Sequence, residues 1–486
     1  MPLPTIPSGN VFSSLPTGYE VANSCRFTRG DSPYMHITPS GDGNLKIFTV
    51  SFWVKRGNAN AGSSGTDRQV IFSNNTNDQI SFHNDTLQFL EDGSNSAITN
   101  MKFLDFSAWY HVVMAFDTSQ STNTNRQKVY VNGKQIDQST GFSTMSYVGQ
   151  DLEMGFGKGS EKMSVGRSDY DGNRHFDGYL AEFYYINGSM LDHTSFGEFD
   201  EDSPTIWKPK EFEGSFGTNG FYLDFEDSAN LGNDANGGTD LTEVNLAAAD
   251  QATDTPTNSF CTLNPLDNYY AGYTFSEGNC KIVTANTPEI YTTSTIWVTA
   301  GRWYAEGKVI NASGAEILGI ASNVAHSNSD TNHLGEKANN WGLYNGGGGG
   351  TAIIYGDASS DSQTATTGLA DFTTNDIMGI YLDLEDNKLY FSKNGTLYSS
   401  TGLSLTDPAS LTVAGNMGAY TFAFGEYGGS APTWEANFGG CPAFSLSSAV
   451  SDDNGYGNFE YSPNITGDGS AKKFYALCTK NLAEFG

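Results

Sequence analysis

Residues 48–57 read FTVSFWVKRG, with a large apolar side chain at every second position. The alternating Phe and Val side chains share one face of an extended chain, which is the pattern of a half-buried β-strand. Residues 109–117, WYHVVMAFD, alternate in the same way. Both stretches therefore predict strands with one face on a core.

Turn residues follow these strands at the positions where hairpins need them. Residues 129–136 read VYVNGKQI, and the Asn132-Gly133 pair favours the positive φ angles of a type I′ turn. Residues 176–188, FDGYLAEFYYING, predict a longer strand that ends at another Asn-Gly pair. The first half of the chain thus predicts a set of antiparallel strands.

The second half repeats this organisation. Residues 376–398 contain alternating apolar positions and two turns, at Asp386-Asn387 and at Lys393-Asn394-Gly395. Further short β-rich runs occupy 302–310, 318–322, 339–348, 418–428 and 434–440. With almost no amphipathic helix, the sequence predicts an all-β protein.

Composition agrees with this class and excludes others. The 486 residues include 31 Phe, 25 Tyr, 7 Trp and 56 Gly, so aromatic surface must be buried between glycine-rich turns. The chain carries 55 Asp plus Glu against 25 Lys plus Arg, a formal charge of -30. No cationic stripe is present, which argues against nucleic-acid binding and against anionic lipid. No stretch approaches the length of a membrane span.

In the first half, SFWVKRG, WYHVVMAFD, VYVNGK and then VGR with FDGYLAEFYYING follow one another in an order that resembles a laminin-G-like domain of the concanavalin A-like group. In the second half, the elements at 303–306, 375–395 and 437–439 resemble those of a SPRY domain, with departures at Ala305 and Asn375. Both resemblances imply jelly-roll β-sandwiches.

We therefore expect two concanavalin A-like sandwiches in tandem. The expected parts are an extended proline-rich arm (1–20), a laminin-G-like sandwich (21–195), a connector with one packed strand (196–260), a SPRY-like sandwich (261–470) and a C-terminal segment (471–486). The tandem resembles virion or tail-associated adhesins of bacteriophages that infect aquatic bacteria. That resemblance implies a virion protein made in the host cytoplasm, and no signal peptide is visible.

Ligand recognition is predicted on loops of the SPRY-like half. The loops 323–347 and 426–434 combine aromatic side chains with Asn and Ser, as glycan sites do. The candidate contacts are His333, Trp341, Tyr344, Tyr427 and Trp434. Internal packing is the alternative for both tryptophans.

Two loops rich in carboxylates are candidate calcium sites, because Ca²⁺ takes six to eight oxygen ligands. The candidate ligands are Asp169, Asp171 and Asn173 in the first loop and Asp234, Asn236 and Asp240 in the second. Neither loop has the glutamate that completes an EF-hand. The alternative is an ordinary turn held by Asp and Asn side chains, and the pattern favours it over an ion site.

Enzymatic chemistry has weaker support. A glycoside hydrolase needs two carboxylates in a cleft, and the nearest patterns, at 224–227 and 383–386, lie where strands meet turns. His111 alternates with core residues, which favours an interior histidine over a general base. The five cysteines are widely spaced, which predicts free buried thiols.

These observations predict a non-enzymatic structural and adhesion protein of a virus particle. Its expected partners are a host-surface glycan, other virion proteins docked through the arm, and further copies of itself, since weak glycan sites gain strength by avidity. The alternatives are a polysaccharide depolymerase and a capsid decoration protein without a glycan ligand.

Overall fold

The computed structural model describes residues 18–57, 68–267, 273–284, 290–312, 314–323, 333–346, 351–356, 364–411, 417–427, 431–466 and 471–486. Most of the predicted arm, residues 1–17, lies outside this set. The described chain forms two compact units. One contains Tyr19–Thr257 and Phe275–Cys280, and the other contains Asn258–Thr274 and Lys281–Gly486.

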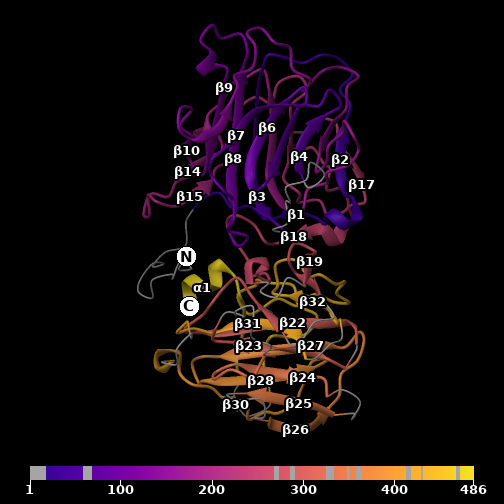
Figure 1. Cartoon of the computed structure of the whole chain (residues 1–486), viewed down its shortest axis with the longest axis vertical. Helices are drawn as coiled ribbons and strands as arrows, with labels where there is room; N and C mark the ends of the chain where they lie inside the picture. The colour runs from indigo at the N-terminus through magenta and orange to yellow at the C-terminus, as the bar shows by residue number, and fades with distance from the viewer. Residues whose placement is uncertain are drawn as a thin grey trace. The chain divides into compact units, whose positions relative to one another are not determined.

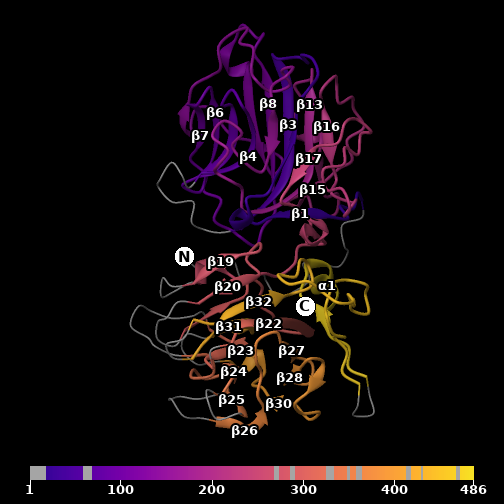
Figure 2. The same cartoon turned by 90° about the vertical axis from the view of Figure 1, so that its right-hand side faces the viewer.

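The first unit is a sandwich of two antiparallel sheets (Figures 1 and 2). One sheet has the order β10-β9-β8-β3-β13-β1-β18, with β16 also paired to β13. Its strands are β1 (Ser24–Phe27), β3 (Ile47–Arg56), β8 (Tyr110–Asp117), β9 (Gln127–Val131), β10 (Lys134–Gln135), β13 (Gly178–Asn187), β16 (Phe221–Leu223) and β18 (Gln251–Ala252).

The opposite sheet has the order β11-β7-β6-β5-β4-β12-β2-β17. Its strands are β2 (Tyr34–Ile37), β4 (Gln69–Asn74), β5 (Gln79–His83), β6 (Thr86–Glu91), β7 (Ser94–Thr99), β11 (Phe142–Met145), β12 (Met163–Val165) and β17 (Thr242–Val244). The core between the sheets contains Phe48, Val50, Phe52 and Val54, as their alternation predicts. A separate hairpin joins β14 (Gly197–Phe199) to β15 (Trp207–Pro209).

The predicted hairpin geometry is confirmed. Asn132 and Gly133, between β9 and β10, have φ angles of 47° and 74°. The connector belongs to this unit, because its strands β16, β17 and β18 extend both sheets. The compact unit therefore continues to Thr257, well past residue 195.

The second unit is also a sandwich. Its larger sheet includes β20 (Lys281–Val283), β22 (Arg302–Asn311), β27 (Ile377–Asp383), β28 (Lys388–Lys393), β29 (Thr396–Leu397), β30 (Leu403–Ser404), β32 (Thr433–Asn437) and β33 (Tyr475–Ala476). The facing sheet, in the order β21-β31-β23-β24-β25-β26, contains β21 (Ile290–Thr293), β23 (Glu316–Ala321), β24 (Trp341–Tyr344), β25 (Thr351–Gly356), β26 (Thr364–Ala370) and β31 (Thr421–Glu426).

The C-terminal part of the chain covers a tyrosine-rich patch of the larger sheet. Tyr304, Tyr381 and Tyr390 pack there against Phe459 and Phe474. The chain then ends in the short helix α1 (Thr479–Phe485). Of the helices that the structure describes, none is long and apolar enough to span a membrane.

All five cysteines are buried thiols outside disulfides, as predicted.

Candidate functional site

A pocket of about 360 Å³ opens between loops at one end of the first unit. Four chain segments line it: the segment just before β3, the β4–β5 turn, the β6–β7 turn and the loop that contains residues 152–158. Its walls combine apolar side chains with carboxylates. The lining residues are Leu45, Thr76, Asp78, Glu91, Asp92, Leu152, Glu153, Met154, Gly155 and Lys158.

Asp78 organises this pocket and is only 4% exposed. Its Oδ1 atom accepts a hydrogen bond from the Asp92 backbone N–H (3.0 Å). Its Oδ2 atom accepts from the Gly155 backbone N–H (2.8 Å) and from the Asn74 side-chain amide (2.9 Å). One carboxylate thus joins three of the four segments, and such charge-assisted bonds hold them in a fixed arrangement.

Gly155 allows the close approach of these loops. A Cβ atom at this position would lie 2.0 Å from Thr76 Oγ1 and 2.5 Å from Asn74 Nδ2. Any larger residue would therefore push the 152–158 loop away from the β4–β5 turn.

The pocket is electrically negative. Lys158 is its one lining cation beside four carboxylates. Burial raises the pKa of Glu91, and the neighbouring Asp78 and Asp92 raise it further. Such a site favours neutral or cationic groups over anions, and its carboxylates can accept hydrogen bonds from hydroxyl groups.

None of the motifs described above indicates this pocket, although the sequence contains a signal for it. In an antiparallel meander the first and third turns lie at the same end of the sheet. Asp78 adjoins the β4–β5 turn, and Asp92 belongs to the β6–β7 turn. The contribution of residues 152–158 comes from a loop far along the chain, and no local pattern predicts it.

The predicted aromatic contacts of the second unit lie in or against its interior. Trp434 is fully buried in β32 and donates its indole N–H to the Gly425 carbonyl (3.0 Å). His333 is 2% exposed, and Trp341 and Tyr344 are each 9% exposed. Trp434 and His333 are thus buried in this structure, and ligand contacts at the five predicted residues stay a prediction.

Only part of that predicted surface comes together. The half-buried Tyr427 ring lies 4.5 Å, between centroids, from both the His333 ring and the Tyr344 ring. Residues 324–332, 347 and 428–430 of the predicted loops lie outside the described residues.

The first predicted calcium loop is occupied by cationic side chains of the protein itself. Asp169 Oδ1 lies 2.8 Å from Arg167 Nη2 and 3.9 Å from Lys162 Nζ. Asp171 Oδ2 lies 3.0 Å from Arg174 Nε, and its Oδ1 accepts from the Asn173 backbone N–H. A divalent ion would have to compete with these cations for the carboxylates, and calcium at this loop stays a prediction.

The second loop is an ordinary turn. Asp234 Oδ1 accepts from the backbone N–H groups of Tyr222 and Asn236, and Asp240 Oδ1 accepts from the Asp234 N–H. Among the described residues, no group of three or more His, Cys, Asp or Glu side chains is arranged to hold a metal ion.

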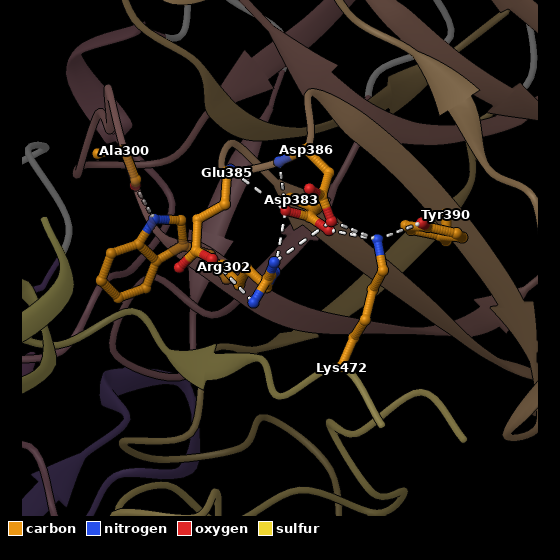
Figure 3. Close-up of polar contacts among 8 residues, drawn as sticks. Ala300, Arg302, Asp383, Glu385, Asp386, Tyr390 and Lys472 are labelled. Atoms are coloured by element: carbon orange, nitrogen blue, oxygen red, sulfur yellow. Dashed lines mark hydrogen bonds and ion pairs between the residues drawn. The ribbon is translucent and has the colours of Figure 1, made fainter. Parts of the chain in front are cut away.

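The acidic pattern at 383–386 forms an ion-pair network (Figure 3). Asp383 is fully buried and lies between two cations: its Oδ1 is 3.0 Å from Arg302 Nε and its Oδ2 is 2.9 Å from Lys472 Nζ. Lys472 also contacts Asp386 (2.8 Å) and the Tyr390 hydroxyl (3.0 Å). The Lys472 ammonium lowers the pKa of Asp386, which disfavours the protonated form of this carboxyl group.

The acidic pattern at 224–227 lies in a turn. Asp224 and Asp227 accept hydrogen bonds from the backbone N–H groups of Glu226 and Ala229.

His111 forms a buried pair with Ser51, with 2.9 Å between Nε2 and Oγ. Trp207 donates its indole N–H to His111 Nδ1 (3.0 Å), so Nε2 carries the ring proton. Burial lowers the pKa of His111 to about 3. The ring has no free acceptor for the serine proton, which confirms the prediction of an interior histidine.

Two family models match the chain. Residues 29–193 match the concanavalin A-like lectin/glucanases superfamily, and residues 303–413 match the SPRY domain. These matches confirm the two domain resemblances, and the pocket lies within the first matched region. No match to the chain was found among curated proteins.

Several solved structures are similar to parts of the chain. The TRIM65 PSpry domain is 15% identical with a TM-score of 0.27, and the match covers 36% of this chain and 91% of that one. The SPRY domain of human HERC1 is 13% identical with a TM-score of 0.25, covering 36% and 94%. A "putative carbohydrate binding protein" from Bacteroides ovatus ATCC 8483 is 18% identical with a TM-score of 0.32, covering 46% and 58%.

Proposed function

We propose that this protein is a non-enzymatic recognition protein that binds carbohydrate in the pocket at the end of its first unit. The observation that carries the proposal is the composition of that pocket. Leu45 and Leu152, which are partly exposed, offer apolar surface for the C–H face of a sugar ring, and Glu91 and Glu153 offer acceptors for its hydroxyl groups. The match of this unit to a superfamily that includes lectins supports the same proposal.

A glycan array tests the proposal with the full chain and two variants. Glu91→Gln with Glu153→Gln removes two acceptors from the pocket and leaves Asp78 in place. Glu198→Gln with Glu201→Gln is the matched control at exposed positions outside the pocket. We expect the pocket variant to lose binding about tenfold or more, and the control to keep it. An array on which the unaltered chain binds no glycan would refute the proposal.

A polysaccharide depolymerase is the enzymatic alternative. The carboxylates of the 383–386 pattern are engaged by Arg302 and Lys472, and those of the 224–227 pattern cap a turn. We therefore propose binding without cleavage. Incubation with the bound glycan, followed by a reducing-end assay, checks this point, and release of new reducing ends would contradict it.

The proposed setting is the surface of a virus particle, on its tail or its capsid. This setting is supported by the resemblance of the tandem arrangement to virion or tail-associated adhesins of bacteriophages. Electron microscopy of particles labelled with an antibody to this chain tests it. Deletion of residues 1–20 should release the protein from particles if that segment is the attachment arm, and retained attachment would contradict the role of the arm.

A further inference from the structure

A cluster of basic and aromatic side chains lies on the outer face of the β2–β12 pair in the first unit, apart from the pocket. Its members come from adjacent strands, because Ser164 of β12 pairs with His36 of β2. We call it the basic cluster, and it contains Tyr34, His36, Lys162, Arg167 and His175, with Asp169 as its acidic member.

Arg167 is the centre of this cluster. Its guanidinium carbon lies 3.5 Å from the centroid of the Tyr34 ring, which is a cation–π contact. The Tyr34 ring lies 5.8 Å from the His36 ring and 6.2 Å from the His175 ring. The two histidines therefore flank the tyrosine that holds the guanidinium in place.

The cations of the cluster outnumber the anion available to them. Asp169 Oδ1 faces both Arg167 Nη2 (2.8 Å) and Lys162 Nζ (3.9 Å). The Arg167 Nε–H is buried and has no hydrogen-bond partner. A buried donor without an acceptor is costly, and the cost is greater when the group is charged. The single carboxylate of Asp169 therefore compensates only part of the positive charge of the cluster.

The neighbouring strands place neutral residues beside the cluster. Thr242 and Val244 of β17 lie opposite His36 and Tyr34, and Ser73 of β4 lies opposite Ser164. Glu243 of β17 lies opposite the core residue Met35 and accepts the Gly232 backbone N–H. This local excess of positive charge stands out in a chain with a formal charge of -30. An anion would be repelled over much of the protein and attracted here.

We propose that the basic cluster is a second ligand site that binds a carboxylate group of an acidic polysaccharide. One carboxylate oxygen would accept from the Lys162 ammonium, and the other would accept from an imidazole N–H of His36. A polyuronate fits better than a nucleic acid, because a cluster of this size neutralises one or two charges rather than a continuous phosphate backbone. This site is independent of the proposed glycan pocket.

Biolayer interferometry with immobilised alginate, a polyuronate, tests the proposal on the full chain. Neutral dextran, dextran sulfate and a single-stranded oligonucleotide are the comparison surfaces. We expect binding to alginate that weakens as salt is raised, with no binding to dextran. Lys162→Gln with His36→Gln should weaken alginate binding about tenfold or more, whereas Lys128→Gln with His193→Gln, outside the cluster, should not.

A thermal melt of each variant separates lost binding from lost folding. If the double variant fails to fold, Lys162→Gln alone should still weaken alginate binding, because this side chain is partly exposed. Alginate binding that the cluster variants leave unchanged would overturn the proposal. So would binding to dextran sulfate or to the oligonucleotide without binding to alginate.

Discussion

The Nζ atom of Lys55 lies 2.7 Å from Oδ2 of Asp254, and each side chain is only 1% exposed. Asp254 also accepts the indole N–H of Trp109 on its second oxygen, at 3.0 Å. Lys55 belongs to β3 and Asp254 follows β18, so this ion pair fastens the end of the connector to a central strand. The pair explains why the connector belongs to the first unit.

Removing one partner of this pair should destabilise the first unit strongly. Asp254→Leu leaves the Lys55 ammonium buried opposite an apolar side chain, at a cost of about 3–5 kcal/mol. Lys55→Met together with Asp254→Leu should recover much of this loss, because no unpaired charge then remains. Urea unfolding followed by tryptophan fluorescence measures both variants.

Lys46→Met is the matched control for this pair. Lys46 and Asp151 form an ion pair of 3.1 Å whose side chains are 36% and 60% exposed. Its loss should cost about 1 kcal/mol or less. Equal destabilisation by Asp254→Leu and Lys46→Met would show that burial of the Lys55 pair has no energetic consequence.

The stability of the first unit should fall as the pH rises from about 4.5 to about 7. Glu182 is 3% exposed and accepts hydrogen bonds from the hydroxyls of Tyr19, Tyr184 and Tyr222. Burial raises its pKa to about 7. Because the folded protein holds this proton more tightly than the unfolded chain, the stabilisation is complete below about pH 4.5 and is lost as the pH rises through about 7.

Glu182→Gln should therefore flatten the dependence of the melting temperature on pH in this range. The amide keeps hydrogen-bonding capacity and has no charge to desolvate. Glu306, in the second unit, also has its pKa raised to about 7 by burial, so Glu306→Gln should act on the transition of that unit instead. A pH profile that Glu182→Gln leaves unaltered would contradict this account of the carboxyl group.

Lys472 should hold the C-terminal part of the chain on the larger sheet of the second unit. It contacts Asp383, Asp386 and Tyr390 (Figure 3), and β33 pairs with β22 a few residues further on. Lys472→Met removes the cation opposite the fully buried Asp383 oxygen. We expect faster amide exchange at Tyr475 and Ala476 and a loss of about 1–3 kcal/mol in unfolding free energy.

Lys473→Met serves as the neighbouring control. Lys473 pairs with Asp453 on the surface, and its side chain is 56% exposed. Exchange at Tyr475 and Ala476 should change little in this variant. The role of Lys472 would be refuted if both variants had the same exchange rates.

The strands were predictable because their signals are local. The alternation in β3 and β8 and the Asn-Gly turn after β9 depend on neighbouring residues only. The ligand loops were less predictable. Whether an aromatic residue is exposed depends on the residue at which the neighbouring strand begins or ends, and the sequence does not fix that residue. Trp434 is the last residue of the predicted loop 426–434. In the structure β32 begins at Thr433, and the indole of Trp434 is buried in the core.

The buried position of Glu182 has no local signal either. The register of β13 against β3 shifts between Ala181 and Tyr184, and Glu182 adopts a φ of 50° at this irregularity. A β-bulge of this kind depends on pairing with a distant strand. The pocket also depends on residues that are distant in the sequence. Asp78 accepts the Gly155 backbone N–H only after separate parts of the sandwich have come together.

Gly133→Ala should destabilise the first unit through two effects that a control can separate. Gly133 has a φ of 74°, which strains any residue with a Cβ atom, and that atom would lie 2.2 Å from Cε3 of Trp207. Gly172 has a similar φ of 67° but nothing within 4 Å of the same position. Gly172→Ala therefore measures strain alone, about 1 kcal/mol, and Gly133→Ala should cost about 1–3 kcal/mol more because Trp207 must move. Thermal unfolding compares the two variants, and equal losses would mean that the β14–β15 hairpin does not pack against the Asn132-Gly133 turn.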